Sequence, residues 1–151
     1  MFDFDLTLAG SGWAEAILRE GDKVYSFDAS WLHDALREFL ENVNLLFTKE
    51  TSGSCWQQEP GELCWTFKRR GDELTVKAEF PIEYQDDRDY DWKQHEFVGT
   101  TSFKRFVAQV ESAFIQILQV WGDEGYASPK GWDYPFPHAE LAELTRLKAT
   151  L

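Results

Sequence analysis

The chain contains few of the residues that build most metal and redox sites. It has only two cysteines, Cys55 and Cys64, and three histidines, His33, His95 and His138. The cysteine spacing matches no zinc pattern, and no histidine lies near either cysteine in the sequence. We therefore expect no metal ion, no cofactor and two free, partly buried thiols. A disulfide is the alternative, if the cysteines face each other across a hairpin.

Positive charge is also scarce. The chain has 15 Lys and Arg against 27 Asp and Glu, which gives a formal net charge of −12. A protein that holds nucleic acid normally presents a positive face to the phosphates, so nucleic acid is excluded as a partner. The one basic cluster, Lys68-Arg69-Arg70, precedes a Gly-Asp turn and is interpreted as the solvated end of a strand.

Long apolar runs are missing. The longest helical apolar patch, around Ala113 to Leu118, contains Gln116 and is too short to cross a bilayer. The first five residues have no basic region followed by an apolar segment, so no signal peptide is expected. The sequence predicts a cytoplasmic protein that does not bind membranes.

Aromatic residues, by contrast, are abundant. The 151 residues include 12 Phe, 7 Trp and 5 Tyr, enough to fill a sizeable core. At this length, one domain that spans residues 1–151 is the natural expectation. Unpaired carboxylates are too costly to bury, so the acidic excess must lie mostly on the surface.

Apolar and polar residues alternate in several short segments, which predicts strands. Three of them are joined by tight turns and suggest an antiparallel meander, and two more form a hairpin across Gly71-Asp72. The predicted strands are Phe2 to Leu8, Trp13 to Arg19, Val24 to Phe27, Leu63 to Lys68 and Leu74 to Phe80, with Cys55 to Gln58 and His95 to Thr100 as further candidates.

Helical spacing occurs in three segments. Ser30 is a candidate cap for a helix whose apolar stripe runs from Leu32 to Leu46. Ser102 opens a second long helix, for which Gly122 is a plausible stop, and Pro137 can begin a short third one. The order of elements has no regular βαβ alternation. We therefore predict an α+β fold: one antiparallel sheet of about five to seven strands, with two long amphipathic helices and a short C-terminal helix on one face.

One acidic motif and the three histidines are the candidates for chemical sites. Asp87-x-Asp89-x-Asp91 matches the first ligands of a helix–loop–helix calcium site, but Trp92 stands where that loop needs Gly, and Val98 where it needs Glu. None of the histidines has the neighbours of a catalytic or metal-binding motif. No catalytic residue is predicted, and the chain is not expected to be an enzyme.

The segment from Glu79 to Trp92 combines carboxylates with aromatic residues. Carboxylates steer a cationic partner, and Tyr and Trp anchor interfaces. The alternative is a solvated acidic loop whose aromatics fold back onto the core. The predicted partner-binding residues are Glu83, Asp86, Asp87, Asp89, Tyr90, Asp91 and Trp92.

A second aromatic segment contains Trp121, Tyr126, Trp132, Tyr134 and Phe136. It could present platforms for a sugar or a peptide, but packing across the end of the fold is preferred. Trp56 and Trp65, on either side of Glu59-Pro60-Gly61, are likewise interpreted as core residues with cross-strand pairing.

In length, acidity, small α+β build and lack of catalytic motifs, the chain resembles the small acidic immunity proteins that bacteria make against secreted toxins. The resemblance implies a cationic protein partner, such as a toxin domain whose basic surface is occluded. If the acidic loop is not the interface, the face with Asp3, Asp5 and Glu15 is the next candidate. An enzyme or ligand-binding domain with a pocket between sheet and helices is the alternative, and a module that dimerises through an edge strand is a third.

Overall fold

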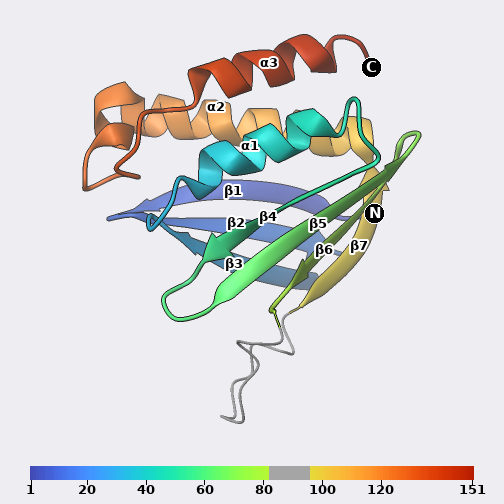
Figure 1. Ribbon diagram of the computed structural model, residues 1–151, viewed down its shortest axis with the longest axis horizontal. Helices are drawn as coiled ribbons and strands as arrows, with labels where there is room; N and C mark the ends of the chain where they lie inside the picture. Colours follow the sequence, from blue (N-terminus) through green and yellow to red (C-terminus); the bar gives the residue numbers. More distant parts are fainter. Residues whose placement is uncertain (82–95) are drawn as a thin grey trace.

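The computed structural model describes residues 1–81 and 96–151, and these form an α+β fold (Figure 1). The described strands are β1 (Asp3–Gly10), β2 (Trp13–Glu20), β3 (Lys23–Ser30), β4 (Thr51–Gln57), β5 (Glu62–Arg70), β6 (Glu73–Glu79) and β7 (Phe97–Ser102). The described helices are α1 (Ala35–Leu45), α2 (Phe103–Ala127) and α3 (His138–Lys148). Each predicted strand segment overlaps an observed strand, but Phe2, Gln58, Phe80 and Glu96 lie just outside the strands, and His95 lies outside the described residues.

The strands form two antiparallel sheets, so the prediction of one sheet is wrong. One sheet has the order β1-β2-β3 and the other β4-β5-β6-β7. The helix α1 carries the chain from β3 to β4, and the two sheets turn their inner faces toward each other. Phe27 contacts Trp65 with ring centroids 5.7 Å apart, and Tyr25 contacts Phe97 at 5.0 Å. Large aromatic rings from the two inner faces therefore meet in the core.

The sheets also meet at the start of β1. The amide of Phe2 donates to the carbonyl of Thr100 at 3.2 Å, and the hydroxyl of Thr101 donates to the carbonyl of Phe2 at 3.0 Å. Farther along the same edge of β1, the side chain of Gln109 on α2 accepts from the amide of Phe4 at 2.9 Å. The helix thus covers an edge strand that would otherwise expose unpaired backbone groups.

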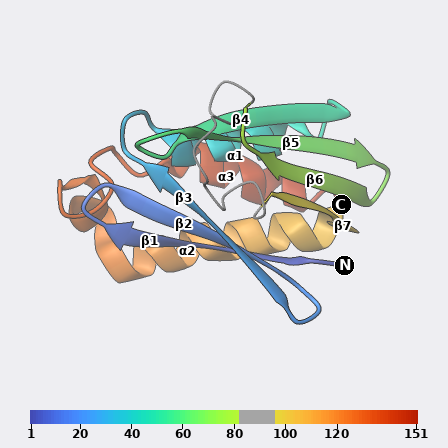
Figure 2. The same ribbon diagram turned by 90° about the horizontal axis from the view of Figure 1, so that it is seen from below.

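The three helices lie on one side of the sheets (Figures 1 and 2). Helix α1 packs on β4 and α2 packs on β1, whereas α3 packs mainly on the other two helices. Of the three described helices, only α2 is long, with 25 residues, whereas α1 and α3 have 11 residues each. The prediction of two long helices, and of a third helix on the sheet, is therefore corrected.

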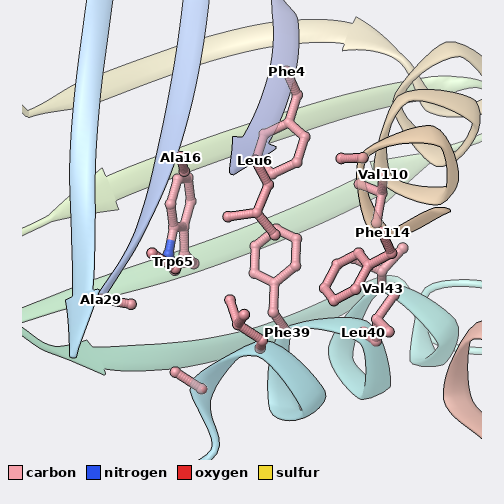
Figure 3. Close-up of a cluster of buried hydrophobic side chains, with 14 of the residues drawn as sticks. Phe4, Leu6, Ala16, Ala29, Phe39, Leu40, Val43, Trp65, Val110 and Phe114 are labelled. Atoms are coloured by element: carbon pink, nitrogen blue, oxygen red, sulfur yellow. The ribbon is translucent and has the colours of Figure 1, made fainter. Parts of the chain in front are cut away.

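The core fills the space between the sheets and the helices (Figure 3). Phe39 of α1 stacks on Phe4 of β1 and meets the rings of Trp56, Trp65 and Phe67 at 5.6 to 5.7 Å. Trp56 and Trp65 are buried and lie 5.1 Å apart, which confirms them as core residues. In the second aromatic segment, Tyr126, Trp132 and Phe136 are buried, which confirms the preference for packing.

The helix ends differ in part from the prediction. Ser30 is the last residue of β3, and Asp34 caps α1 by accepting from the amide of Arg37 at 3.4 Å. Ser102 does cap α2, since its hydroxyl accepts from the amide of Arg105 at 3.2 Å. Gly122 has a φ of 68° and kinks α2, but the helix resumes and ends at Ala127. No helix among the described residues is long and apolar enough to cross a membrane.

The prediction of two free thiols is wrong, because Cys55 and Cys64 form a disulfide. The two residues are exact partners in the ladder of β4 and β5, and their Cα atoms are 4.0 Å apart. Strand β4 begins at Thr51, several residues before the predicted start, and the hairpin register then brings the cysteines together.

Candidate partner-binding surface

The residues predicted to bind a partner all lie in the segment 82–95, outside the described residues. These are Glu83, Asp86, Asp87, Asp89, Tyr90, Asp91 and Trp92, and the incomplete calcium motif lies in the same segment. Within the described residues, an acidic surface is formed by the face of β1-β2-β3 that points away from the core. It includes the face named above as the next candidate.

Strand alternation builds this surface, which is here called the acidic sheet face. Phe4, Leu6, Ala16, Leu18 and Phe27 point into the core, so the residues between them point outward. The ladder register then aligns the outward residues in rows across the three strands. The acidic sheet face comprises Asp3, Asp5, Thr7, Trp13, Glu15, Ile17, Arg19, Val24, Ser26 and Asp28.

Two carboxylates stand side by side in the middle of this face. Glu15 on β2 is the ladder partner of Asp28 on β3, and Thr7 flanks Glu15 on the other side. Like charges directly opposite each other destabilise a sheet. Burial of the carboxyl group, together with repulsion from Glu15, raises the pKa of Asp28. In the described part of the chain, neither carboxylate has a cation as an ion-pair partner, and Glu15 Oε2 accepts only a hydroxyl bond from Ser26 at 2.7 Å.

A third carboxylate is satisfied by α2. Oδ1 of Asp3 accepts from Nε and Nη2 of Arg105, at 2.9 and 2.5 Å, and from Nε2 of Gln109 at 2.7 Å. The hydrogen bonds from Arg105 and Gln109 lower the pKa of Asp3. Asp3 therefore serves to fix α2 beside β1, whereas Glu15 and Asp28 remain available to a cationic group.

Apolar side chains accompany the carboxylates. Val24 is 64 % exposed, and Ile17 and Trp13 are half-buried on the same face. Just after β3, Trp31 and Leu32 are 44 % and 52 % exposed. Isolated exposed apolar residues are common on proteins, but beside unpaired carboxylates they provide surface that a partner can desolvate.

The basic cluster is only partly solvated. Lys68 and Arg70 are exposed, as predicted. Arg69 instead lies with its guanidinium 3.9 Å from the centre of the Phe103 ring and donates to the carbonyls of Leu46 and Gly71. This cation therefore packs the end of β5 against α2 and α1.

A shallow groove of about 510 Å³ lies between α1 and α3. Leu45, Phe47 and Leu147 contribute apolar surface, and charged residues surround them. The complete lining is Glu41, Asn44, Leu45, Phe47, Thr48, Glu143, Arg146 and Leu147. This groove is not between sheet and helices, where the alternative of a ligand-binding domain places its pocket.

The described histidines make structural contacts. Nε2 of His33 is 3.0 Å from the carbonyl of Cys55 and 3.3 Å from Glu38. Nε2 of His138 meets a carboxylate oxygen of Asp123, just after the kink at Gly122, and its ring packs on Phe136. Both rings thus join elements that are distant in the sequence.

Comparison with known proteins gave no matching family model, no matching curated protein and no matching solved structure. Sequence alternation had already placed Asp3, Asp5 and Glu15 on one face. Asp28 joins this face because β3 extends to Ser30, beyond the predicted end of the third strand at Phe27.

Proposed function

We propose that this chain is an acidic binding protein that covers the basic surface of a cationic protein partner, in the manner of an immunity protein with its toxin. The observation that carries the proposal is the opposed pair Glu15 and Asp28 on an exposed sheet face. Partial removal of the Asp28 carboxyl group from water is the larger cause of its raised pKa, and repulsion from Glu15 adds to it, so the folded protein disfavours the ionised form of Asp28. A cationic group that binds between them removes that repulsion.

The wider surface supports the same proposal. With a formal net charge of −12, the protein attracts cationic proteins over long distances, which raises association rates at low salt. Ile17 and Trp13 lie two residues from Glu15 on the same face of β2, and Val24 lies farther along that face as the ladder partner of Arg19. These side chains supply apolar contacts, which mainly slow dissociation. A toxin that cleaves nucleic acid needs a positive surface for its substrate, and an acidic inhibitor competes for that surface.

Candidate partners should be sought first among the proteins encoded by the genes beside the one that encodes this chain. A basic toxin domain encoded there should form a complex with the purified protein and lose its activity in it. Its association rate should fall steeply with added salt, because salt screens the attraction between exposed charges. A complex whose association rate does not change with salt would contradict electrostatic occlusion.

A further inference from the structure

The disulfide lies on the outward face of the second sheet, on the opposite side of the strands from the core side chains. Trp56, Leu63 and Trp65 alternate with the cysteines and point inward, so Cys55 and Cys64 point outward. Both cysteines are half-buried rather than enclosed, and β4 is an edge strand of its sheet. A dithiol reductant can therefore approach the sulfur atoms from solvent.

The hairpin does not depend on the disulfide to hold its register. Strands β4 and β5 are paired over seven positions, from Thr51 with Lys68 to Gln57 with Glu62. Trp56 on β4 and Trp65 on β5 are both buried and hold the two strands against the core. After reduction, the two thiols should therefore stay opposite each other.

A carboxylate completes the group. Oε1 of Glu62 is 3.4 Å from Sγ of Cys64, and the ligand atoms of Cys55, Cys64 and Glu62 all lie within 4.8 Å of one another. Nε2 of Gln57 lies 3.4 Å from Oε2 of Glu62, on the strand opposite, and helps to orient the other oxygen toward the sulfurs. Tetrahedral Zn²⁺, with bonds of about 2.0–2.3 Å, places its ligand atoms roughly 3.3–3.8 Å apart.

We propose that reduction of the disulfide creates a site for a soft divalent cation such as Zn²⁺, with Cys55, Cys64 and Glu62 as its protein ligands. Thiolates select Zn²⁺ or Cd²⁺ over Mg²⁺ and Ca²⁺, which prefer oxygen ligands. The acidic chain adds a favourable field for any cation. Water takes the fourth position of the tetrahedron.

The site forms in two steps, reduction of the disulfide and binding of the cation. A dithiol reductant gives two electrons and two protons, the bond between the sulfurs of Cys55 and Cys64 breaks, and the reductant becomes a disulfide. The cation then displaces the two thiol protons, because the thiolate is the form that binds metal. The oxidised protein lacks thiolates and should not form the site. Metal binding is thereby tied to the redox state of the surroundings.

The site is tested by titrating the reduced protein with Cd²⁺ and Zn²⁺ under anaerobic conditions. Cd²⁺ should give the ultraviolet charge-transfer band of thiolate ligands, with saturation at one equivalent per chain. Zn²⁺ should compete with a chromophoric chelator for the same site. The oxidised protein, and reduced protein with alkylated thiols, should give neither signal. The near-ultraviolet circular dichroism of the reduced protein should show that the aromatic core is intact before metal is added.

Glu62→Gln isolates the third ligand and leaves both cysteines in place. It should weaken Zn²⁺ binding by about tenfold or more, since even outer-shell changes have effects of that size. Glu73→Gln, which removes one exposed charge from the same sheet, is the matched control and should leave the affinity unchanged. Equal binding by the oxidised or alkylated protein would overturn the proposal. So would equal affinity of Glu62→Gln and the wild type, or loss of the folded core on reduction alone.

Discussion

The indole N–H of Trp132 donates a hydrogen bond of 2.9 Å to Oδ1 of Asp34, across 98 positions of sequence. Both side chains are buried. Asp34 also caps α1 through the amide of Arg37, so one carboxylate joins the first turn of α1 to the loop that precedes α3. Burial, and then the charge of Asp34, raise the pKa of Tyr126 in the same cluster.

Trp132→Phe should lower the free energy of unfolding by at least about 2 kcal/mol, because it removes a hydrogen bond to a buried carboxylate and leaves a cavity where the larger indole ring was. Urea unfolding followed by far-ultraviolet circular dichroism measures the change. Tyr134→Phe is the matched control, since it removes an exposed bond from the Tyr134 hydroxyl to the Trp31 carbonyl. A control loss as large as that of Trp132→Phe would show that the bond to Asp34 has no special weight.

The first turn of α1 also shows where sequence reasoning stops. The apolar period of the helix was visible, but Ser30 and Asp34 are both good capping residues. The choice depends on where β3 ends and on the distant Trp132, and neither is a local property. Period alone therefore predicted the helix and not its beginning.

The same limit applies to the sheets. Where apolar and polar residues alternate clearly, as in β1, β5 and β6, the alternation correctly predicts the inward residues, such as Phe4 and Trp65. It does not determine which strands pair, and for this reason the sequence predicts one sheet where the structure has two. Gly53 and Ser54, with no apolar side chain, hid the start of β4 and with it the register that places Cys55 opposite Cys64.

Glu111 predicts how stability depends on pH. It is buried on α2, and its carboxylate accepts from the ammonium of Lys148 at 2.6 Å and the hydroxyl of Thr145 at 2.7 Å on α3. Burial alone would raise the pKa of Glu111, but these hydrogen bonds and the charge of Lys148 lower it. Since the folded protein binds this proton less readily than the unfolded chain, the stabilisation is lost as the pH falls through the folded pKa.

Glu111→Gln should therefore lower the free energy of unfolding by about 1 kcal/mol at neutral pH and have little effect in acid. Urea unfolding over a pH series measures both. Glu143→Gln removes the exposed pair with Arg146 on α3 and should leave stability unchanged at neutral pH. A Glu111→Gln effect that persists undiminished in acid would contradict the role of the ionised carboxylate.

Removing the charge of Asp28 should change the free energy of unfolding in the opposite direction to removing that of Glu111. Its raised pKa means that the ionised form is disfavoured in the folded protein. Asp28→Asn should raise the free energy of unfolding by about 0.5 kcal/mol at neutral pH. The gain should disappear as the pH falls through the pKa of Asp28, because the folded wild type then takes up the proton. Glu20→Gln, whose ladder partner is Lys23, should give no such gain, and equal gains from both variants would show that only net charge matters.

The acidic sheet face and the acidic segment predicted from sequence can be separated with three variants of equal charge change. Glu15→Lys with Asp28→Lys alters the sheet face, and Asp87→Lys with Asp89→Lys alters the segment. Glu73→Lys with Glu143→Lys is the control on other surfaces. All three should slow the association of a cationic partner a little, since all change the net charge equally. The sheet-face variant should slow it most at low salt and have the weakest salt dependence, because local charges dominate the encounter.

The dissociation rate of the complex distinguishes residues that contact the partner from charges that only attract it at a distance. Ile17→Ala removes apolar surface beside Glu15 and leaves every charge in place. It should speed dissociation and leave the association rate unchanged, as the loss of a contact residue does. Stopped-flow or surface-based kinetics with the partner measures both rates. A surface outside the interface can change neither rate beyond the effect of net charge. If only the Asp87 and Asp89 variant slows association beyond that effect, and Ile17→Ala changes neither rate, the interface is the segment of residues 83–92 and not the sheet face.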